Sequence, residues 1–333
     1  MSKYGNSDRD DPVPEERGSR FRLPVIAWLS VLFFAACTKM SPEDGVARHD
    51  GTLVRLTVSL PQPALPTKGA RAGSLSGDAE NRIEDVMILV LEQENGKYVY
   101  RYMTEGERLE STGSGTQFQA KLLSTSKPVK LMLAGNYGDA FAAYAPSPGH
   151  SEAEVKAGIG CSFTGAAQSL PMYGEIAVPS GLEADRENRF NVKMLRAVAR
   201  IDVEKDLTAD SRPLRIESVR LYRPNDKIQL APDESFAPES PRVTAPSVFA
   251  GAVKSQSPVV TETSEPDPVS IAGIYVPEAD GVADAAARLT EATCIVVGGY
   301  YDGQSQPTYY RVDFDPGLEG HPFGQILRNY KYV

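Results

Sequence analysis

The ten residues Gly51–Leu60, GTLVRLTVSL, decide the fold class, because two kinds of side chain alternate along them without a break. One face of this segment carries Val54, Leu56, Val58 and Leu60, and the other carries Leu53, Arg55, Thr57 and Ser59. A period of two residues is typical of a half-buried β-strand. Prolines at positions 61, 63 and 66 end the pattern.

Further strand signals follow along the chain. The apolar run at 83–91, IEDVMILVL, leads to Asn95-Gly96, a strong hairpin signal, and KYVYRYM at 97–103 is the returning strand. Other segments with strand character are 117–123, 129–134, 188–203, 213–222, 271–277, 293–301, 308–314 and 326–333. Helical periodicity is limited to short stretches at 151–156 and 284–291. Many short strands at even spacing predict an all-β chain of two consecutive β-sandwiches, over residues 51–184 and 185–333.

The composition fits globular domains rich in turns. Hydrophobic residues make up 41% and charged residues 24% of the chain, and 25 prolines and 28 glycines favour short strands over long helices. The net charge of −9 argues against nucleic acid as a partner, because binding phosphates requires a basic face.

The apolar run Leu23–Ala36 has the length of a secretory signal. A membrane-spanning helix needs about 20 apolar residues, whereas the apolar region of a signal peptide has about 7–15. Arg20 and Arg22 supply positive charge before the run, and Cys37 directly after Ala35-Ala36 indicates a bacterial lipobox. We expect cleavage before Cys37 and lipidation of its thiol, which would hold the protein on a membrane. A buried core segment with a chance cysteine is the alternative.

The residues on either side of this run have separate roles. Residues 1–20 are acidic, which a signal peptide normally avoids, so either translation starts downstream or residues 1–36 are a signal peptide with an atypical extension. Residues 37–50 are polar and lack a strand pattern, which indicates a tether between the lipid and the folded body.

No catalytic site, cofactor site or metal site is predicted. Gly113-Ser114-Gly115 is a degraded nucleophile motif without a following helix, and none of the histidines His49, His150 and His321 lies near a cysteine or a carboxylate cluster at ligand spacing. The carboxylate pairs Glu84-Asp85 and Asp313/Asp315 are better explained by strand edges and turns than by acid–base catalysis. Cys161 and Cys294 allow either one disulfide or two separate buried thiols.

Two groups of tyrosines leave a binding role open. Tyr98, Tyr100 and Tyr102 form one group, and Tyr300, Tyr301, Tyr309 and Tyr310 form the other. They could form a stacking face for sugars, although cross-strand aromatic pairs that stabilise hairpins are the commoner cause. A surface glycan- or ligand-binding lipoprotein is therefore the alternative function.

Several segments, together with the lipobox, resemble one family. The most specific are Arg196–Ile201 (RAVARI), Tyr275–Glu278 (YVPE) and Leu327–Tyr332 (LRNYKY), and none is a catalytic motif. Residues 37–333 resemble the Bacteroidales fimbrillins, the major and minor fimbrial subunits of type V pili. The resemblance implies two transthyretin-like Greek-key β-sandwich domains, export as a lipoprotein to the outer membrane and cell surface, and a structural role in an adhesive fimbria.

The resemblance also implies a route of assembly. In pilins of this family an arginine-specific protease removes the first strand, and a strand of another subunit fills the groove by donor-strand insertion. Arg48 matches the cleavage position in context, and Arg71 is a second candidate. The displaced strand would be Leu53–Leu60, with Val54, Leu56, Val58 and Leu60 in the groove.

One departure from the family concerns the C-terminus. Pilins of this family continue past the RNxxY strand into a donor strand, whereas this sequence stops at Val333. We therefore expect either a truncated C-terminal domain or an anchor or cap that accepts a strand without donating one. A role as shaft, anchor or accessory subunit stays open.

Overall fold

The computed structural model describes residues 51–60, 78–112, 115–142, 144–165, 169–184, 186–205, 214–234, 242–263, 268, 270–283, 285–301, 303–314 and 322–333. Cys37, Arg48 and Arg71 lie outside these ranges. Strands dominate the described residues, which confirms the predicted all-β class.

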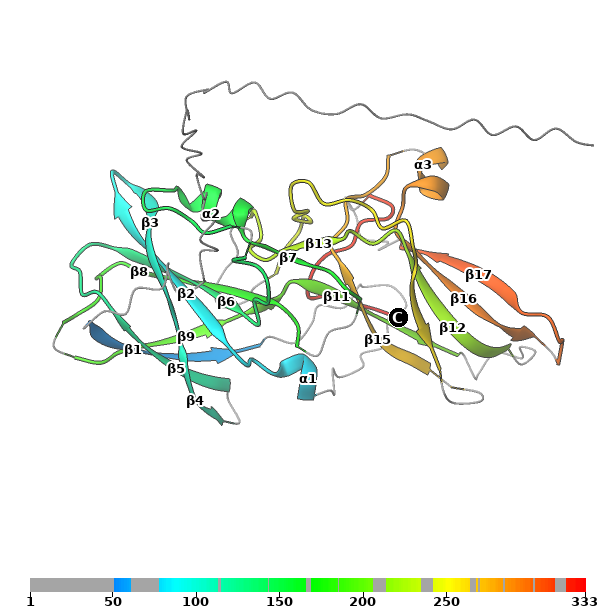
Figure 1. The fold of residues 1–333 in the computed structure, drawn as a ribbon, viewed down its shortest axis with the longest axis horizontal. Helices are drawn as coiled ribbons and strands as arrows, with labels where there is room; N and C mark the ends of the chain where they lie inside the picture. The colour runs from blue at the N-terminus through cyan, green and yellow to red at the C-terminus, as the bar shows by residue number, and fades with distance from the viewer. Residues whose placement is uncertain are drawn as a thin grey trace, which may run out of the picture. The chain divides into compact units, whose positions relative to one another are not determined.

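Two sheets enclose the first hydrophobic core (Figure 1). One has the order β4-β5-β1-β9 and consists of β4 (Glu107–Thr112), β5 (Gly115–Leu122), β1 (Thr52–Ser59) and β9 (Asn188–Lys193). The other has the order β10-β8-β6-β2-β3 and consists of β10 (Leu195–Arg196), β8 (Met172–Val178), β6 (Val129–Gly135), β2 (Val86–Glu94) and β3 (Lys97–Glu105). Among the described strands, the chain passes between the two sheets five times, after β1, β3, β5, β8 and β9. Strands from both sheets therefore line the first core.

Two further sheets enclose the second core. One, in the order β15-β11-β18, contains β15 (Ser270–Pro277), β11 (Val198–Glu204) and β18 (Lys331–Tyr332). The other, in the order β14-β12-β16-β17, contains β14 (Val259–Glu262), β12 (Leu214–Tyr222), β16 (Cys294–Tyr301) and β17 (Thr308–Asp313). A small sheet pairs β7 (Gly160–Ser162) with β13 (Lys227–Gln229). The described helices are α1 (Asp78–Asn81), α2 (Glu152–Gly158) and α3 (Ala285–Thr290).

The predicted hairpin turn at Asn95-Gly96 is confirmed, and helix α2 begins with a complete cap. Asn95 and Gly96 both have positive φ, at 50° and 80°, and join β2 to β3. Left-handed angles at both central residues are typical of the tight hairpin turn that matches the twist of the strands. Ser151 caps α2, and Glu154 reaches back to the backbone of Ser151, which is a complete capping box.

The segment 188–203 differs from the prediction of one strand. It is divided into β9, β10 and the first part of β11, which pair with β1, β8 and β15 respectively. The residues between these strands, Met194 and Ala197, are fully buried. Where a chain passes from one sheet to the other inside a core, its side chains are buried on every side. The alternation of apolar and polar residues therefore does not show where one strand ends and the next begins. The domain boundary at 184/185 stays a prediction, although β9 and β10 pair with strands that precede it.

Residues 224–270 are rich in Pro, Ser, Glu and Thr, a composition typical of a surface excursion, yet part of the segment is buried. It contains the short strands β13 and β14, and Leu230, Ala231 and Val243 are buried in the first core. A few apolar positions in a polar segment were therefore enough to anchor it.

The C-terminal segment is held by buried charges. The guanidinium of Arg328 is fully buried and donates to the Glu278 carboxylate, at 2.8 and 2.7 Å, and to the carbonyls of Gln229 and Leu230. Ile326 lies in the second core and Leu327 in the first. The predicted RNxxY segment is therefore a structural clasp that contacts both cores.

A second charged cluster lies on β11 and β18. Asp202 accepts hydrogen bonds from Arg200 at 2.7 Å, from Lys331 at 2.8 Å and from the backbone of Gly273 at 2.9 Å. Burial by itself would raise the pKa of Asp202, but these hydrogen bonds outweigh it and lower the pKa below its usual value of 3.8. The cluster joins β18 to β11 through side chains as well as backbone.

Candidate functional site

Strand β1 is an interior strand of its sheet rather than an edge strand (Figure 1). It pairs antiparallel with β5, from Thr52 opposite Leu122 to Val58 opposite Thr116. On its other side it pairs parallel with β9, from Val54 opposite Asn188 to Ser59 opposite Lys193. Both backbone edges of β1 are therefore used, and its removal would leave a gap between β5 and β9.

The inward face of β1 is sealed from solvent. Val54, Leu56 and Val58 are each 0% exposed in the first core. Leu60, the fourth predicted groove residue, lies one position beyond the end of β1 and is partly buried against the same core. Burying a Val or Leu side chain contributes about 1.5–3 kcal/mol, so the three strand residues together contribute roughly 5–9 kcal/mol.

The groove that holds β1 is lined by matching apolar residues. Phe118 of β5 and Phe190 of β9 stand opposite Leu56 from the two sides. Ala120 of β5 lies opposite Val54, and Val192 of β9 lies opposite Val58. Without β1 these side chains would face water along a channel one strand wide. An extended segment with apolar residues at alternate positions is the chemical shape that fits it.

Close backbone contacts fix both ends of β1. A Cβ at Gly51 would lie 2.0 Å from the carbonyl oxygen of Leu122, and one at Gly115 would lie 2.2 Å from the carbonyl oxygen of Val58. Only glycine allows such approach, and Gly115 also has a positive φ of 150°. The register of β1 against β5 is therefore set at both ends.

A buried polar cluster that the sequence did not reveal holds the start of β1. The Thr52 hydroxyl donates to the carbonyl of Glu183 at 2.6 Å. The Asn188 amide, also buried, donates to the carbonyls of Glu183 and Arg186 at 3.0 and 3.2 Å, and its oxygen accepts from the Glu183 N–H at 3.1 Å. The sequence does show that Thr52 falls on the same face of the strand as the buried Val54, Leu56 and Val58. It does not show the hydrogen-bond partners of Thr52, which lie more than 130 positions away.

The described residues carry little reactive chemistry. Among them, no group of three or more His, Cys, Asp or Glu side chains is placed to hold a metal ion. Cys161 and Cys294 are free and buried, which resolves the alternatives left open by the sequence. Burial raises the pKa of the Cys161 thiol to about 12 and also raises the pKa of the Cys294 thiol, so neither is a ready nucleophile.

The two carboxylate pairs of the sequence contain side chains that are buried or ion-paired where the structure describes them. Burial raises the pKa of Asp85, while Glu84 forms an ion pair with Arg82 at 2.6 Å. Asp313 is held by Arg311 at 2.7 Å, and Asp315 and the motif residues Gly113 and Ser114 lie outside the described residues.

The tyrosines of the second group do not share one face. Tyr309 lies opposite Gly298 and Tyr310 lies opposite the core residue Val297, so the two neighbouring rings point to opposite sides of the sheet. Tyr309 and Tyr310 are both exposed, and arginine guanidiniums lie over the rings of Tyr300 and Tyr309. A single stacking platform of four rings is therefore not formed.

No helix in the described part of the chain is both long and apolar enough to cross a membrane. Cys37 and Arg48 fall outside that part, so lipidation and cleavage stay predictions.

Comparison with known proteins finds similarity in solved structures only. No family model matches the chain, and no curated protein matches it. The chain is similar to the tip fimbrial protein Mfa3 from Porphyromonas gingivalis with a C-terminal truncation, at 15% identity over 84% of this chain and 92% of that one, with a TM-score of 0.47. Candidate cell adhesion proteins from Bacteroides eggerthii (15% identity, 83% of each chain, TM-score 0.45) and Parabacteroides distasonis (13% identity, 84% and 90%, TM-score 0.45) are also similar. The resemblance to fimbrial proteins that the sequence predicts is thus found again among solved structures.

Proposed function

We propose that the chain is a structural, non-enzymatic subunit of a cell-surface fimbria, in a shaft, anchor or accessory position, that mediates adhesion and assembles by strand exchange. In this proposal β1 is displaced, and a strand of another subunit takes its place between β5 and β9. The lipid on Cys37 would hold the chain at the outer membrane, and an arginine-specific protease would mature it.

The observation that carries this proposal is the interior position of the first described strand. Its three buried side chains contribute roughly 5–9 kcal/mol, which is comparable with the whole unfolding free energy of a domain, about 5–15 kcal/mol. A sandwich that loses β1 therefore keeps little stability until another strand with alternating apolar residues replaces it. This makes the empty groove a strong acceptor for such a strand.

The position of the two candidate arginines separates two ways of freeing β1. Cleavage after Arg48 cuts the chain before β1 but leaves the strand joined to residues 61–77. Cleavage after Arg71 cuts the chain after β1 and, combined with a cut at Arg48, leaves the strand held only by non-covalent contacts. Release of a β1 peptide therefore requires the second cut.

The test treats the full chain with an arginine-specific protease, stops the protease with an inhibitor because the peptide contains Arg55, and then adds an excess of the biotinylated peptide GTLVRLTVSL. We expect the peptide to replace β1 in the wild type and much more slowly in the Arg71→Ala variant. A peptide carrying Leu56→Asp should fail to bind, while the matched peptide carrying Leu53→Asp should bind, because Leu56 faces the core and Leu53 does not. If neither parent peptide nor Leu53→Asp peptide is captured and β1 stays in place after both cuts, strand exchange is wrong.

A further inference from the structure

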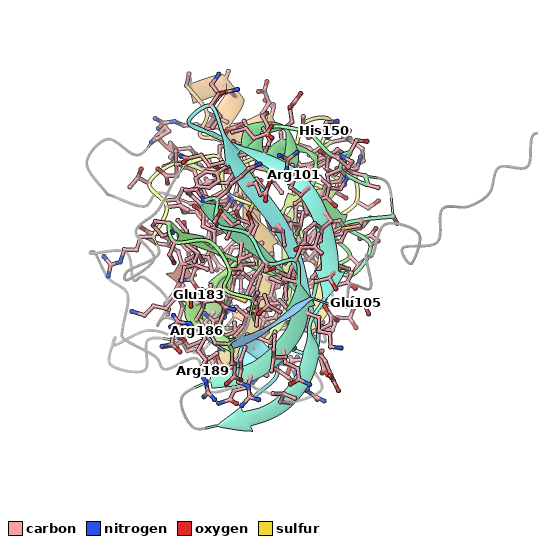
Figure 2. All side chains as sticks on the ribbon, turned by 90° about the vertical axis from the view of Figure 1, so that its left-hand side faces the viewer. Arg101, Glu105, His150, Glu183, Arg186 and Arg189 are labelled. Carbon is pink, nitrogen blue, oxygen red and sulfur yellow. The ribbon has the colours of Figure 1, made fainter. Side chains whose placement is uncertain are left out.

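A pocket lies at the end of the first sandwich where β1 begins. Its volume is about 540 Å³, within the range of about 300–1,000 Å³ that is usual for small-molecule sites. Residues from the connections β5–β6 and β8–β9 line it: Ser124, Thr125, Ser126, Ser180, Leu182, Glu183, Ala184 and Arg186. Figure 2 shows Glu183, Arg186 and Arg189 following one another along one side of this end of the molecule.

The floor of the pocket is held by a bridge between the two connections. The Thr125 N–H donates to the Leu182 carbonyl at 3.0 Å, and the Leu182 N–H donates back to the Thr125 carbonyl at 2.8 Å. Gly181 has a φ of 76°, and a Cβ there would lie 2.0 Å from the Thr125 carbonyl oxygen. The two connections are therefore locked together before any ligand arrives, which lowers the cost of binding.

The chemistry of the lining indicates a neutral, hydroxyl-rich ligand. Ser124, Ser126 and Ser180 are exposed, and each hydroxyl can both donate and accept a hydrogen bond. The charges of Glu183 and Arg186 offset each other in an ion pair of 2.8 Å, so neither an anion nor a cation is favoured. Leu182 is buried and the lining contains no aromatic ring, so a flat apolar ligand has little to contact.

The Glu183–Arg186 wall of this pocket is fastened by β1. The carbonyl of Glu183 accepts from the Thr52 hydroxyl at 2.6 Å, and that of Arg186 accepts from it at 3.2 Å. Thr52 and Asn188 are both buried, so each of these hydrogen bonds is shielded from water. Loss of β1 would remove the Thr52 hydroxyl and leave the carbonyls of Glu183 and Arg186 bound to the Asn188 amide.

We propose that this pocket binds a neutral saccharide and that its affinity depends on β1. The Glu183 carboxylate and the Arg186 guanidinium are placed to accept from and donate to neighbouring sugar hydroxyls, and the serines complete the polar contacts. The saccharide site itself does not depend on strand exchange. The loss of saccharide affinity when β1 is displaced rests on the proposed function. Because coupling between two binding events is reciprocal, a bound saccharide would also retain β1.

The experiment titrates the full chain with glucose, galactose, mannose, fucose and N-acetylglucosamine, alone and as disaccharides, and follows binding by NMR. We expect at least one probe to bind saturably to the wild type and to a Ser257→Trp control on an exposed segment, and at least tenfold more weakly to Ser180→Trp, which fills the pocket. Absence of saturable binding to every probe overturns the site, as does equal affinity for Ser180→Trp.

The coupling is tested with two variants of one residue. Thr52→Val keeps the branched shape but removes the hydroxyl, and Thr52→Ser keeps the hydroxyl. We expect about fivefold weaker saccharide binding or more in Thr52→Val, with faster amide exchange at 183–188, and near wild-type affinity in Thr52→Ser. Equal affinity in all three proteins overturns the coupling. Failure of the peptide-exchange test leaves these titrations unchanged, so the two proposals fail separately.

Discussion

Replacement of Leu56 by alanine is the most direct test of how far the first sandwich depends on β1. Leu56 is 0% exposed and stands between Phe118 and Phe190, which are held by strands on opposite sides. A Leu→Ala change in a core costs about 2–5 kcal/mol, and more where the surroundings cannot collapse into the cavity. Two rings fixed by different strands cannot both move inward, so we expect a loss of about 3–5 kcal/mol.

The matched control is Leu53→Ala on the other face of the same strand. Leu53 is only partly buried, so its truncation should cost about 1 kcal/mol or less. Urea unfolding followed by circular dichroism measures both, with a lower midpoint and an unchanged slope expected for Leu56→Ala. Similar losses in the two variants, or a loss below about 1 kcal/mol for Leu56→Ala, would refute the inward assignment and with it the argument for a groove.

Three further outcomes follow from the buried charges and thiols. Arg328→Ala should lower the unfolding free energy by about 3–5 kcal/mol, because it leaves the Glu278 carboxylate buried without its partner, and the double variant with Glu278→Gln should recover part of that loss in the same urea assay. The pKa of Asp202 is lower in the folded chain than its usual 3.8, so the stability it contributes is present above that pH and is lost as the pH falls through the folded pKa. Acid titrations should therefore show a shallower loss of stability below pH 4 in Asp202→Asn, and an unchanged profile would contradict the pairing with its two cationic neighbours. Iodoacetamide at pH 8 should leave Cys161 and Cys294 unmodified in the folded chain and label both in urea, as read by mass spectrometry, whereas labelling of the folded chain would show that these thiols are accessible.

Local features of the fold could be predicted from the sequence, whereas the positions at which the chain changes from one sheet to the other could not. The alternation in 51–60, the Asn95-Gly96 turn and the Ser151 cap each depend on a few neighbouring residues, and each is present. The division of 188–203 depends on which sheet each part joins, and consecutive buried residues hide that information. Strand β4 (Glu107–Thr112) was not predicted, because its sequence ERLEST has no apolar alternation.

The residues of the candidate site likewise differ in whether they could be predicted from the sequence. Val54, Leu56 and Val58 could be assigned to one face from their spacing alone, whereas the clamp of Thr52 on the 183–188 segment requires the fold to bring residues 131 positions apart into contact. The pocket beside it is lined by serines, and exposed serines in a sequence look like ordinary turn residues.

The opposite directions of β5 and β9 have a consequence for the polarity of any strand that lies between them. Because β1 is antiparallel to one and parallel to the other, a strand inserted in reverse would meet the same pair of neighbours, one of each kind. The inward set Val54, Leu56, Val58 reads the same from either end. Backbone pairing and the central side chains therefore favour neither direction of the inserted strand. The direction depends on the two ends of β1, because one end carries the hydroxyl of Thr52 and the other carries the apolar side chain of Leu60. A subunit lattice built through this groove would therefore take its polarity from the residues that the incoming strand carries at the positions of Thr52 and Leu60.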